Sequence, residues 1–409
     1  MTAGQELVAC FATYDYINPA TDEVSIRNNF CQGSTAHGWA LPHTKCTELD
    51  NNVMANNTVG SASIGFIFNV VPGMCVGFSY AKAYACDIGQ IAGPPGREAI
   101  KLTHFIMADN GRSVTLKIGA SEGHTNHTAY LENSYITALS RPDCPECYGA
   151  EATDCTRNIG VRMFSASANG ETMPSKFGSG YDVICKQEVF DNKAFVTNVV
   201  FDGFKKDYSG ALSSKCASNY VFRPHSGASD VIGSHSLYDC TCQNCDSQSF
   251  VLCDEPNPKN LGWFGGCGDM NCTGKINYLV KDFNGSFLGQ KGTIMPNHIA
   301  IGENEPTCSY NDNMNGYVCS GFDFGVLQYE SIAPDYNTKV HFPVSLKYSG
   351  GNYTTLTNGW REWDWLGSEP LNKRFNRFVT IVKYNQTYNM TFASEPPSYM
   401  QFLHQRSSN

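Results

Sequence analysis

Short apolar runs alternate with asparagine-containing turns over residues 25–118. Residues 26–29 read Ile-Arg-Asn-Asn, and residues 53–59 read Val-Met-Ala-Asn-Asn-Thr-Val. A looser copy, Phe-Ile-Met-Ala-Asp-Asn, covers residues 105–110. None of these runs shows the ten or more residues with a period of 3.6 that an amphipathic helix needs. The pattern therefore indicates short β-strands, arranged in about four repeating units.

The asparagine at the end of each unit predicts how the units are arranged. Asn29 and Asn57 are 28 residues apart, and Asn57 and Asn110 are 53 apart, about two periods. In a parallel β-helix, successive coils stack about 4.8 Å apart and like residues lie above like. An asparagine can take the left-handed conformation at a corner and bond its amide to the next coil. We therefore expect Asn28 or Asn29, Asn57 and Asn110 at one corner of successive coils; a β-sandwich with Asn-rich loops is the alternative.

The fold class that follows is all-β, with two regions. We expect a right-handed parallel β-helix with cysteine-rich loop insertions over residues 1–298, and a small β-sandwich-like region over residues 299–409. In the second region the asparagine period is lost, and residues 344–348 alternate as half-buried antiparallel strands do. Such a region would cover the exposed edge of the last coil.

Composition excludes several classes of function. Charged residues make up only 16% of the chain, the net charge is −9, and no Lys/Arg run is present, which argues against a nucleic-acid partner. No stretch reaches the roughly 18 uninterrupted apolar residues of a membrane span. Residues 1–25 lack the features of a signal peptide, so we interpret the sequence as an internal piece of a longer chain.

Cysteines and glycosylation sequons together indicate an oxidising, extracellular setting. The chain has 18 cysteines, many of them clustered. The disulfide candidates are Cys144, Cys147, Cys240, Cys242, Cys245, Cys253, Cys267, Cys272, Cys308 and Cys319. The seven Asn-x-Ser/Thr sequons are Asn56, Asn126, Asn271, Asn284, Asn352, Asn385 and Asn389.

Two clusters of cysteines have a second interpretation. Cys240, Cys242, Cys245 and Cys253 could bind zinc as thiolates, but their spacing is uneven for two Cys-x₂₋₄-Cys pairs, so disulfides are favoured. The Cys-Pro-Glu-Cys sequence at residues 144–147 resembles a redox pair, but no thioredoxin-like βαβ pattern surrounds it. We predict no metal site and no cofactor.

Carboxylates on the expected coils raise the question of catalysis. Glycoside hydrolases use two carboxylates about 5–9 Å apart, a spacing that neighbouring coils could supply. Turn capping, in which a carboxylate accepts backbone N–H groups, is the favoured interpretation of all of them. The residues concerned are Asp109, Glu132, Asp191, Asp202 and Asp282. We predict no catalytic residue among them.

Four stretches resemble a known family. Residues 26–29 and 56–59 are similar to the β-helix coils of the fibrocystin family. Residues 278–292 resemble the stretch that closes the helix in that family, and Asn-Gly-Trp at residues 358–360 resembles the start of its last β region. The same module occurs in a hyaluronan-binding protein that induces cell migration and in the transmembrane hyaluronidase. The resemblance implies a parallel β-helix and an extracellular, membrane-tethered parent protein of a cell or ciliary surface.

These observations favour a non-enzymatic structural or adhesion segment of a surface glycoprotein. Its expected partners are other extracellular proteins, glycans, or other domains of the same longer chain. The alternative is a module that binds polysaccharide or hydrolyses a hyaluronan-type polysaccharide.

Overall fold

The computed structural model describes the following part of the chain: residues 9–12, 26–41, 46, 49, 54–68, 75–86, 88–92, 99–119, 126–138, 159–166, 191–204, 220–224, 233–245, 278–296, 300–311, 314, 316–333, 344–348, 355–357, 360–361, 374–392 and 400–405.

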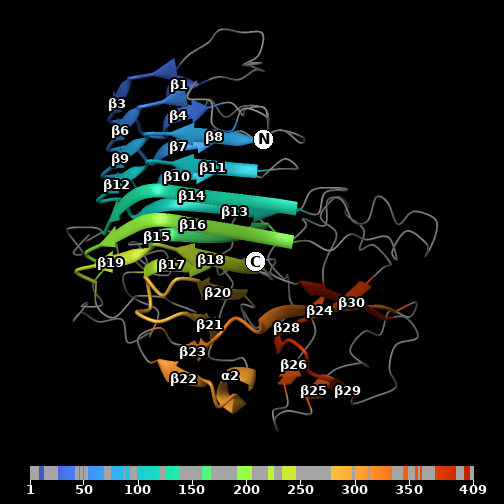
Figure 1. Cartoon of the computed structure of the whole chain (residues 1–409). Helices are drawn as coiled ribbons and strands as arrows, with labels where there is room; N and C mark the ends of the chain where they lie inside the picture. The colour runs from blue at the N-terminus through green and yellow to red at the C-terminus, as the bar shows by residue number, and fades with distance from the viewer. Residues whose placement is uncertain are drawn as a thin grey trace, which may run out of the picture.

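The predicted parallel β-helix is confirmed, and its coils have three faces (Figure 1). The strands of the first face stack in parallel in chain order. They are β2 (Ile26–Arg27), β5 (Met54–Ala55), β8 (Val76–Ser79), β11 (Ala99–Thr103), β14 (Asn126–Thr137), β16 (Asp191–Asp202), β18 (Gly233–Tyr238) and β20 (Tyr278–Asp282).

The other two faces repeat this order. The second face consists of the far halves of β14 and β16 together with β3 (Phe30–Gln32), β6 (Thr58–Gly60), β9 (Lys82–Tyr84), β12 (Ile106–Ala108) and β19 (Thr241–Gln243). The third face is a seven-stranded parallel sheet of β1 (Ala9–Ala12), β4 (His37–Leu41), β7 (Ile64–Phe68), β10 (Ile88–Ala92), β13 (Arg112–Gly119), β15 (Ile159–Ala166) and β17 (Tyr220–Pro224).

The prediction for the corner asparagines is correct for Asn29 and Asn57 and wrong for Asn110. β3 pairs with β6, so Asn29 lies directly beside Asn57 between the first and second faces. In the coil of Asn110 this place belongs to Phe105, and Asn110 lies one strand further on, between the second and third faces. Each coil has two left-handed turns separated by a short strand, and both accept asparagine, so spacing alone does not distinguish them.

The core consists of columns of apolar side chains that point into the coils. Like residues stack above like because every coil is in register with the next. The column of the first face is Ile26, Met54, Phe78, Leu102, Leu131, Val196 and Leu237, all buried. The Phe78 ring packs edge-on against Phe66 and Phe68 of the third face, with centroids 5.1 Å away in each case. Burial of such side chains contributes roughly 1.5–3 kcal/mol each.

Glycines near the start of the third-face strands allow the backbones of successive strands to approach closely. Gly38, Gly65 and Gly89 occupy the same place in successive coils. A Cβ on Gly65 would lie 2.4 Å from the carbonyl oxygen of Gly89, and a Cβ on Gly89 would lie 2.6 Å from that of Ser113. The close approach therefore requires the absence of a side chain.

The coil stack ends in antiparallel structure. β21 (Gly292–Pro296) pairs with β20, and β23 (Gly316–Ser320) and β22 (Cys308–Asn311) extend the same sheet. A short helix, α2 (Ala300–Asn304), lies beside this hairpin. β22 and β23 thus pair into the sheet of coils beyond residue 298, and the division at that residue stays a prediction.

Two antiparallel sheets follow. One has the order β27 (Trp360–Arg361), β28 (Arg374–Lys383), β24 (Phe324–Ala333) and β30 (Met400–Gln405). The other has the order β26 (Thr355–Thr357), β25 (Val344–Tyr348) and β29 (Tyr388–Phe392). Phe324 and Ile381 of the first sheet are buried in one apolar cluster with Leu279 of the last coil.

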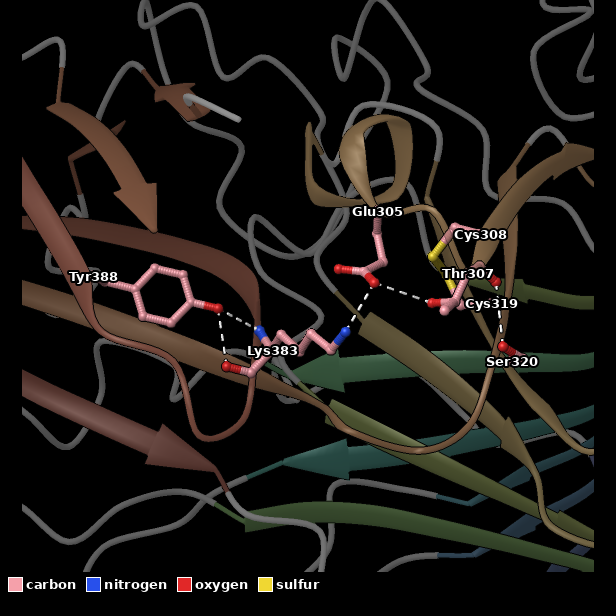
Figure 2. Close-up of polar contacts among 7 residues, drawn as sticks. All are labelled: Glu305, Thr307, Cys308, Cys319, Ser320, Lys383 and Tyr388. Carbon is pink, nitrogen blue, oxygen red and sulfur yellow. Dashed lines mark hydrogen bonds and ion pairs between the residues drawn. A yellow bond between two sulfur atoms is a disulfide. The ribbon is translucent and has the colours of Figure 1, made fainter. Parts of the chain in front are cut away.

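Polar contacts join the segment between α2 and β22 to β28 of the first antiparallel sheet (Figure 2). The Lys383 ammonium donates to Glu305 Oε1 at 2.8 Å, and the Thr307 hydroxyl donates to the same oxygen at 3.2 Å. The Tyr388 hydroxyl accepts from the Lys383 backbone N–H and donates to its carbonyl. Glu305 is buried, so this ion pair fixes the orientation of the C-terminal strands against α2 and β22.

Candidate functional site: the first corner of the coils

The turn between the first and second faces, here named the first corner, presents a row of side chains to solvent. One residue of each coil takes the left-handed conformation there, with φ between 50° and 60°. These residues are Asn28, Asn56, Tyr80, His104, Asn133, Asn198 and Asp239. All of them are exposed, and register places each directly above the next.

Amide side chains hydrogen-bond along this row. Asn56 Nδ2 donates to Asn28 Oδ1 at 2.7 Å, and Asn198 Nδ2 donates to Asn133 Oδ1 at 2.8 Å. At the end of the stack, the Asn284 amide donates to an Asp239 carboxylate oxygen. Each bond joins two neighbouring coils at the surface, as expected of a stacked asparagine turn.

Between the two amide pairs the row is aromatic. The rings of Tyr80 and His104 stack with centroids 4.4 Å apart and an interplanar angle of 15°. Tyr80 is 46% exposed. Asn, Asp and His are enriched in the left-handed conformation, which costs other side chains about 1–2 kcal/mol. Tyr80 therefore occupies a position where asparagine would be easier for the backbone.

The residues that follow the first corner point inward and complete the backbone hydrogen bonds. Asn57 Oδ1 accepts from the Asn29 backbone N–H at 3.2 Å, and its amide donates to the Ile26 carbonyl at 2.9 Å. In a later coil, Ser134 Oγ accepts from the Phe105 N–H at 3.0 Å. Polar side chains at these places satisfy backbone groups that the turn leaves unpaired.

The second face beside this corner carries exposed apolar side chains. Phe30 is 61% exposed, Ile106 45% and Tyr135 37%. Ile106 and Tyr135 are direct neighbours across the pair of β12 and β14. Ile106 and Tyr135, here named the apolar strip, are therefore adjacent on this face, whereas Phe30 lies three coils before Ile106, with Thr58 and Lys82 at the positions between them.

The five carboxylates proposed as turn caps have separate surroundings. Asp282 is fully buried and accepts from the N–H groups of Gly285, Phe287 and Leu288 at 2.7–3.2 Å. Burial raises the pKa of Asp282, and these backbone bonds oppose that rise. The loop that follows Asp282 closes the last coil, as the family resemblance implied. Phe287 of this loop is buried in the core, where its ring packs against Phe222.

The remaining carboxylates are also accounted for individually. Asp202 accepts from the Tyr135 hydroxyl at 2.5 Å and from the Asn244 amide at 2.9 Å, and these bonds lower the pKa of Asp202. Glu132 lies 3.8 Å from the Lys101 ammonium. Asp109 is the left-handed residue of its turn, and Asp191 begins β16. The contacts of Asp202 are those of a turn carboxylate and that of Glu132 is an ion pair, whereas the roles of Asp109 and Asp191 stay predictions.

The cysteine predictions have a mixed outcome. Cys242 is bonded to Cys245, and Cys308 to Cys319. Cys240 differs from the expectation: it is a buried thiol that donates to the Val196 carbonyl at 3.3 Å. Burial raises the pKa of Cys240 to about 12. Its side chain follows the first corner and so points into the core, where no second cysteine among the described residues meets it. The candidates outside the described residues are Cys144, Cys147, Cys253, Cys267 and Cys272.

Two bridges were missed by grouping cysteines along the sequence. Cys10 is bonded to Cys31, 21 residues away, and Cys46 to Cys75, 29 residues away. Each bridge joins different coils, so their separation is close to the period of the repeat, which is the signal that could have found them.

Four sequon asparagines have described side chains, and all four are exposed: Asn56, Asn284, Asn385 and Asn389. Asn126 begins β14, and Asn271 and Asn352 lie outside the described residues. Their glycosylation stays a prediction. No three His, Cys, Asp or Glu side chains gather into a possible metal site within the described ranges.

The fold and its bridges define a class, a disulfide-bonded parallel β-helix protein with antiparallel sheets after its last coil. No protein-family model matches the chain. The chain is 22% identical to fibrocystin-L of Mus musculus over 451 aligned residues, covering 95% of this chain and 10% of that protein. It is 22% identical to fibrocystin-L of Homo sapiens over 250 residues, covering 51% of this chain and 6% of that protein.

This homology makes the chain a fibrocystin-like protein, as the resemblance of its coils predicted. The chain spans about a tenth of the length of the mouse relative. The disulfides indicate an extracellular domain. In the described ranges, no helix has the length and apolar character needed to cross a membrane.

Proposed function

We propose that this chain is a rigid, non-enzymatic segment of the extracellular part of a fibrocystin-like protein at the surface of a cell or cilium. It acts there as a spacer or adhesion surface for other extracellular proteins, for glycans, or for other domains of the same longer chain. The observation that carries the proposal is the unbroken register of the first face, whose eight parallel strands span about 34 Å at the usual strand spacing.

The corner contacts and disulfides support rigidity. In a solenoid each coil contacts only its neighbours, so its stiffness depends on the bonds between adjacent coils. The amide pairs of the first corner and the Cys10–Cys31 bridge connect such coils. The separate engagement of Asp202 and Asp282 supports a non-enzymatic role, because a glycoside hydrolase needs two carboxylates facing one substrate bond.

The test uses the full chain secreted from eukaryotic cells. Incubation with hyaluronan and other long polysaccharides is expected to leave their size profile unchanged. Shortening that disappears in Asp109→Asn or Asp191→Asn would overturn the non-enzymatic proposal. Small-angle scattering is expected to give an elongated particle whose shape does not change with ionic strength, and a flexible ensemble would contradict the spacer role.

Polysaccharide binding without hydrolysis is the second candidate, and the exposed apolar strip of Ile106 and Tyr135 favours it. Aromatic faces stack on apolar ligand surfaces, and polar neighbours fix their orientation. Binding to a polysaccharide column that is lost in Tyr135→Ala but kept in Tyr310→Ala would support this candidate, since neither substitution creates a sequon. Tyr310 is a matched control because it is 43% exposed on β22, away from the strip.

A further inference from the structure

An N-glycosylation sequon lies one coil away from the exposed aromatic stack. Asn56, Asn57 and Thr58 form the sequon, and Asn56 is the exposed, left-handed residue of its corner with φ 55°. Tyr80 occupies the same corner in the next coil, and the Asn56 backbone N–H donates to Ser79 at 3.3 Å. The two side chains therefore start about 4.8 Å apart.

The Asn56 amide uses one of its two N–H groups in the bond to the preceding coil, which leaves the other for modification. One N–H donates to Asn28 Oδ1, on the side of the preceding coil. The two N–H bonds of a planar amide diverge, so the second is directed away from Asn28, and Tyr80 is the neighbour on its other side. A sugar on Nδ2 can replace this second hydrogen and leave the bond to Asn28 intact.

The aromatic pair offers a surface that fits a sugar. Tyr80 and His104 stack nearly parallel, so His104 covers one face of the Tyr80 ring and the opposite face is directed toward the coil of Asn56. Both have the left-handed conformation, with φ 56° and 58°, although asparagine occupies this corner in the coils before and after them. Asn, Asp and His are enriched in this conformation but Tyr is not, so Tyr80 persists at a backbone cost of about 1–2 kcal/mol, which a surface contact would offset.

We propose that Asn56 is N-glycosylated and that the first sugars of its glycan pack on the Tyr80–His104 stack. In this modification Asn56 Nδ2 bonds to C1 of an oligosaccharide carried on a lipid pyrophosphate. The C1–O bond to phosphate breaks, the lipid pyrophosphate leaves, and Nδ2 loses one proton. The bound glycan then covers the first corner and shields the neighbouring apolar strip from solvent.

The first measurement is peptide mapping of the full chain secreted from eukaryotic cells, before and after removal of glycans. A glycan on Asn56 is expected, absent in Thr58→Val and retained in Thr58→Ser. Thr58→Val removes the acceptor sequence without changing Asn56 or its bond to Asn28. An unmodified Asn56 in the secreted chain would overturn the proposal.

The second measurement separates packing from mere attachment by a double-mutant cycle. Loss of the glycan through Thr58→Val is expected to lower the unfolding midpoint by about 1–3 °C in the parent chain. In a Tyr80→Asn background the same loss is expected to have no effect. Tyr80→Asn removes the ring and places a residue that favours the left-handed conformation at this corner, so the variant is expected to fold. It creates no new sequon, because residues 80–82 would read Asn-Ala-Lys.

Ring-current shifts give a direct readout of the contact. Protons of the first sugar are expected to shift upfield in the parent chain and to lose this shift in Tyr80→Asn. Equal midpoint changes in both backgrounds, or unshifted sugar protons, would show that the glycan is attached but does not pack on the stack. Rigidity and lack of catalysis are not measured here, so failure of this inference leaves the proposed function to its own tests.

Discussion

Replacing Asn110 by alanine tests whether buried corner amides hold the coils together. Asn110 lies at the turn between the second and third faces and is 1% exposed. Its Oδ1 accepts from the Cys86 N–H at 3.0 Å, and its Nδ2 donates to the Ala83 carbonyl at 2.9 Å. Both partners belong to the preceding coil and are buried, so alanine removes two bonds between coils in one step.

The magnitude follows from the burial of the groups that lose a partner. A buried backbone N–H or C=O left unsatisfied costs about 1–3 kcal/mol. Two such groups give an expected loss of about 2–6 kcal/mol in the free energy of unfolding. Asn57→Ala is the matched comparison, since it also removes an inward amide. There the loss is expected to be smaller, because Asn29 is exposed and its N–H can bond water.

The assay is denaturant unfolding with the disulfides intact, followed by tryptophan fluorescence, since Trp39, one of five tryptophans, is buried in the third face. Asn110→Asp adds a pH test, because a carboxylate keeps the acceptor for Cys86 but faces the Ala83 carbonyl. Burial raises the native pKa of such an aspartate, so this variant should regain stability as pH falls through that pKa. A loss below about 1 kcal/mol in Asn110→Ala, or a larger loss in Asn57→Ala, would refute the reasoning.

Three further predictions test other parts of the fold. Gly89→Ala should lower the unfolding midpoint by several degrees, since its Cβ would lie 2.6 Å from a backbone oxygen. Gly289→Ala should lower it less, since its Cβ meets no atom within 4 Å and only the strain of alanine at φ +79°, about 1–2 kcal/mol, remains. The Cys240 thiol, with its pKa raised to about 12 by burial, should react with a maleimide only after denaturation, and labelling of the native chain would contradict its position. Burial lowers the pKa of Lys281 to about 8, so the native state binds fewer protons than the unfolded state above that pH. The free energy of unfolding of the parent chain relative to Lys281→Met should therefore rise from pH 7 to 9.5, and a flat difference would exclude a buried amine there.

The fold could be predicted from the sequence because its determinants repeat. The inward columns of the strands are apolar in most coils, so residues 26–29 and 53–59 show the same order of residue types. The left-handed turn after each short strand favours asparagine, which marks the corner in the first coils. In the next coils the marker is lost, because Tyr80 and His104 stand at the same corner at intervals of 24 residues from Asn56. The spacing of asparagines therefore predicts Asn110 at the first corner, although this residue belongs to the turn between the second and third faces.

Contacts between coils were harder to predict than the coils themselves. Cys10 and Cys31 are neighbours in space because the chain passes most of the way around one coil over their sequence separation of 21 residues. Clustering of cysteines along the sequence does not show this. The cluster at residues 240–245 misleads for the opposite reason. Cys240 points into the core after the first corner, whereas Cys242 and Cys245 flank the second corner at Asn244 and bond to each other across it. Proximity in sequence predicts a bridge only where the side chains share a face.

The same geometry indicates where function can reside in this protein. Inward positions are restricted to side chains that fit the columns, and the carboxylates that sequence inspection singled out, such as Asp202 and Asp282, are engaged in turn contacts. The first corner is different, because its side chains leave the coil without entering the core, and any residue that tolerates the left-handed turn keeps the fold. Tyr80 tolerates it poorly and is nevertheless 46% exposed, with its ring stacked on that of His104. A residue that costs the backbone free energy and leaves nearly half of its surface in solvent points to a ligand at the surface as well as to the stability of the coil.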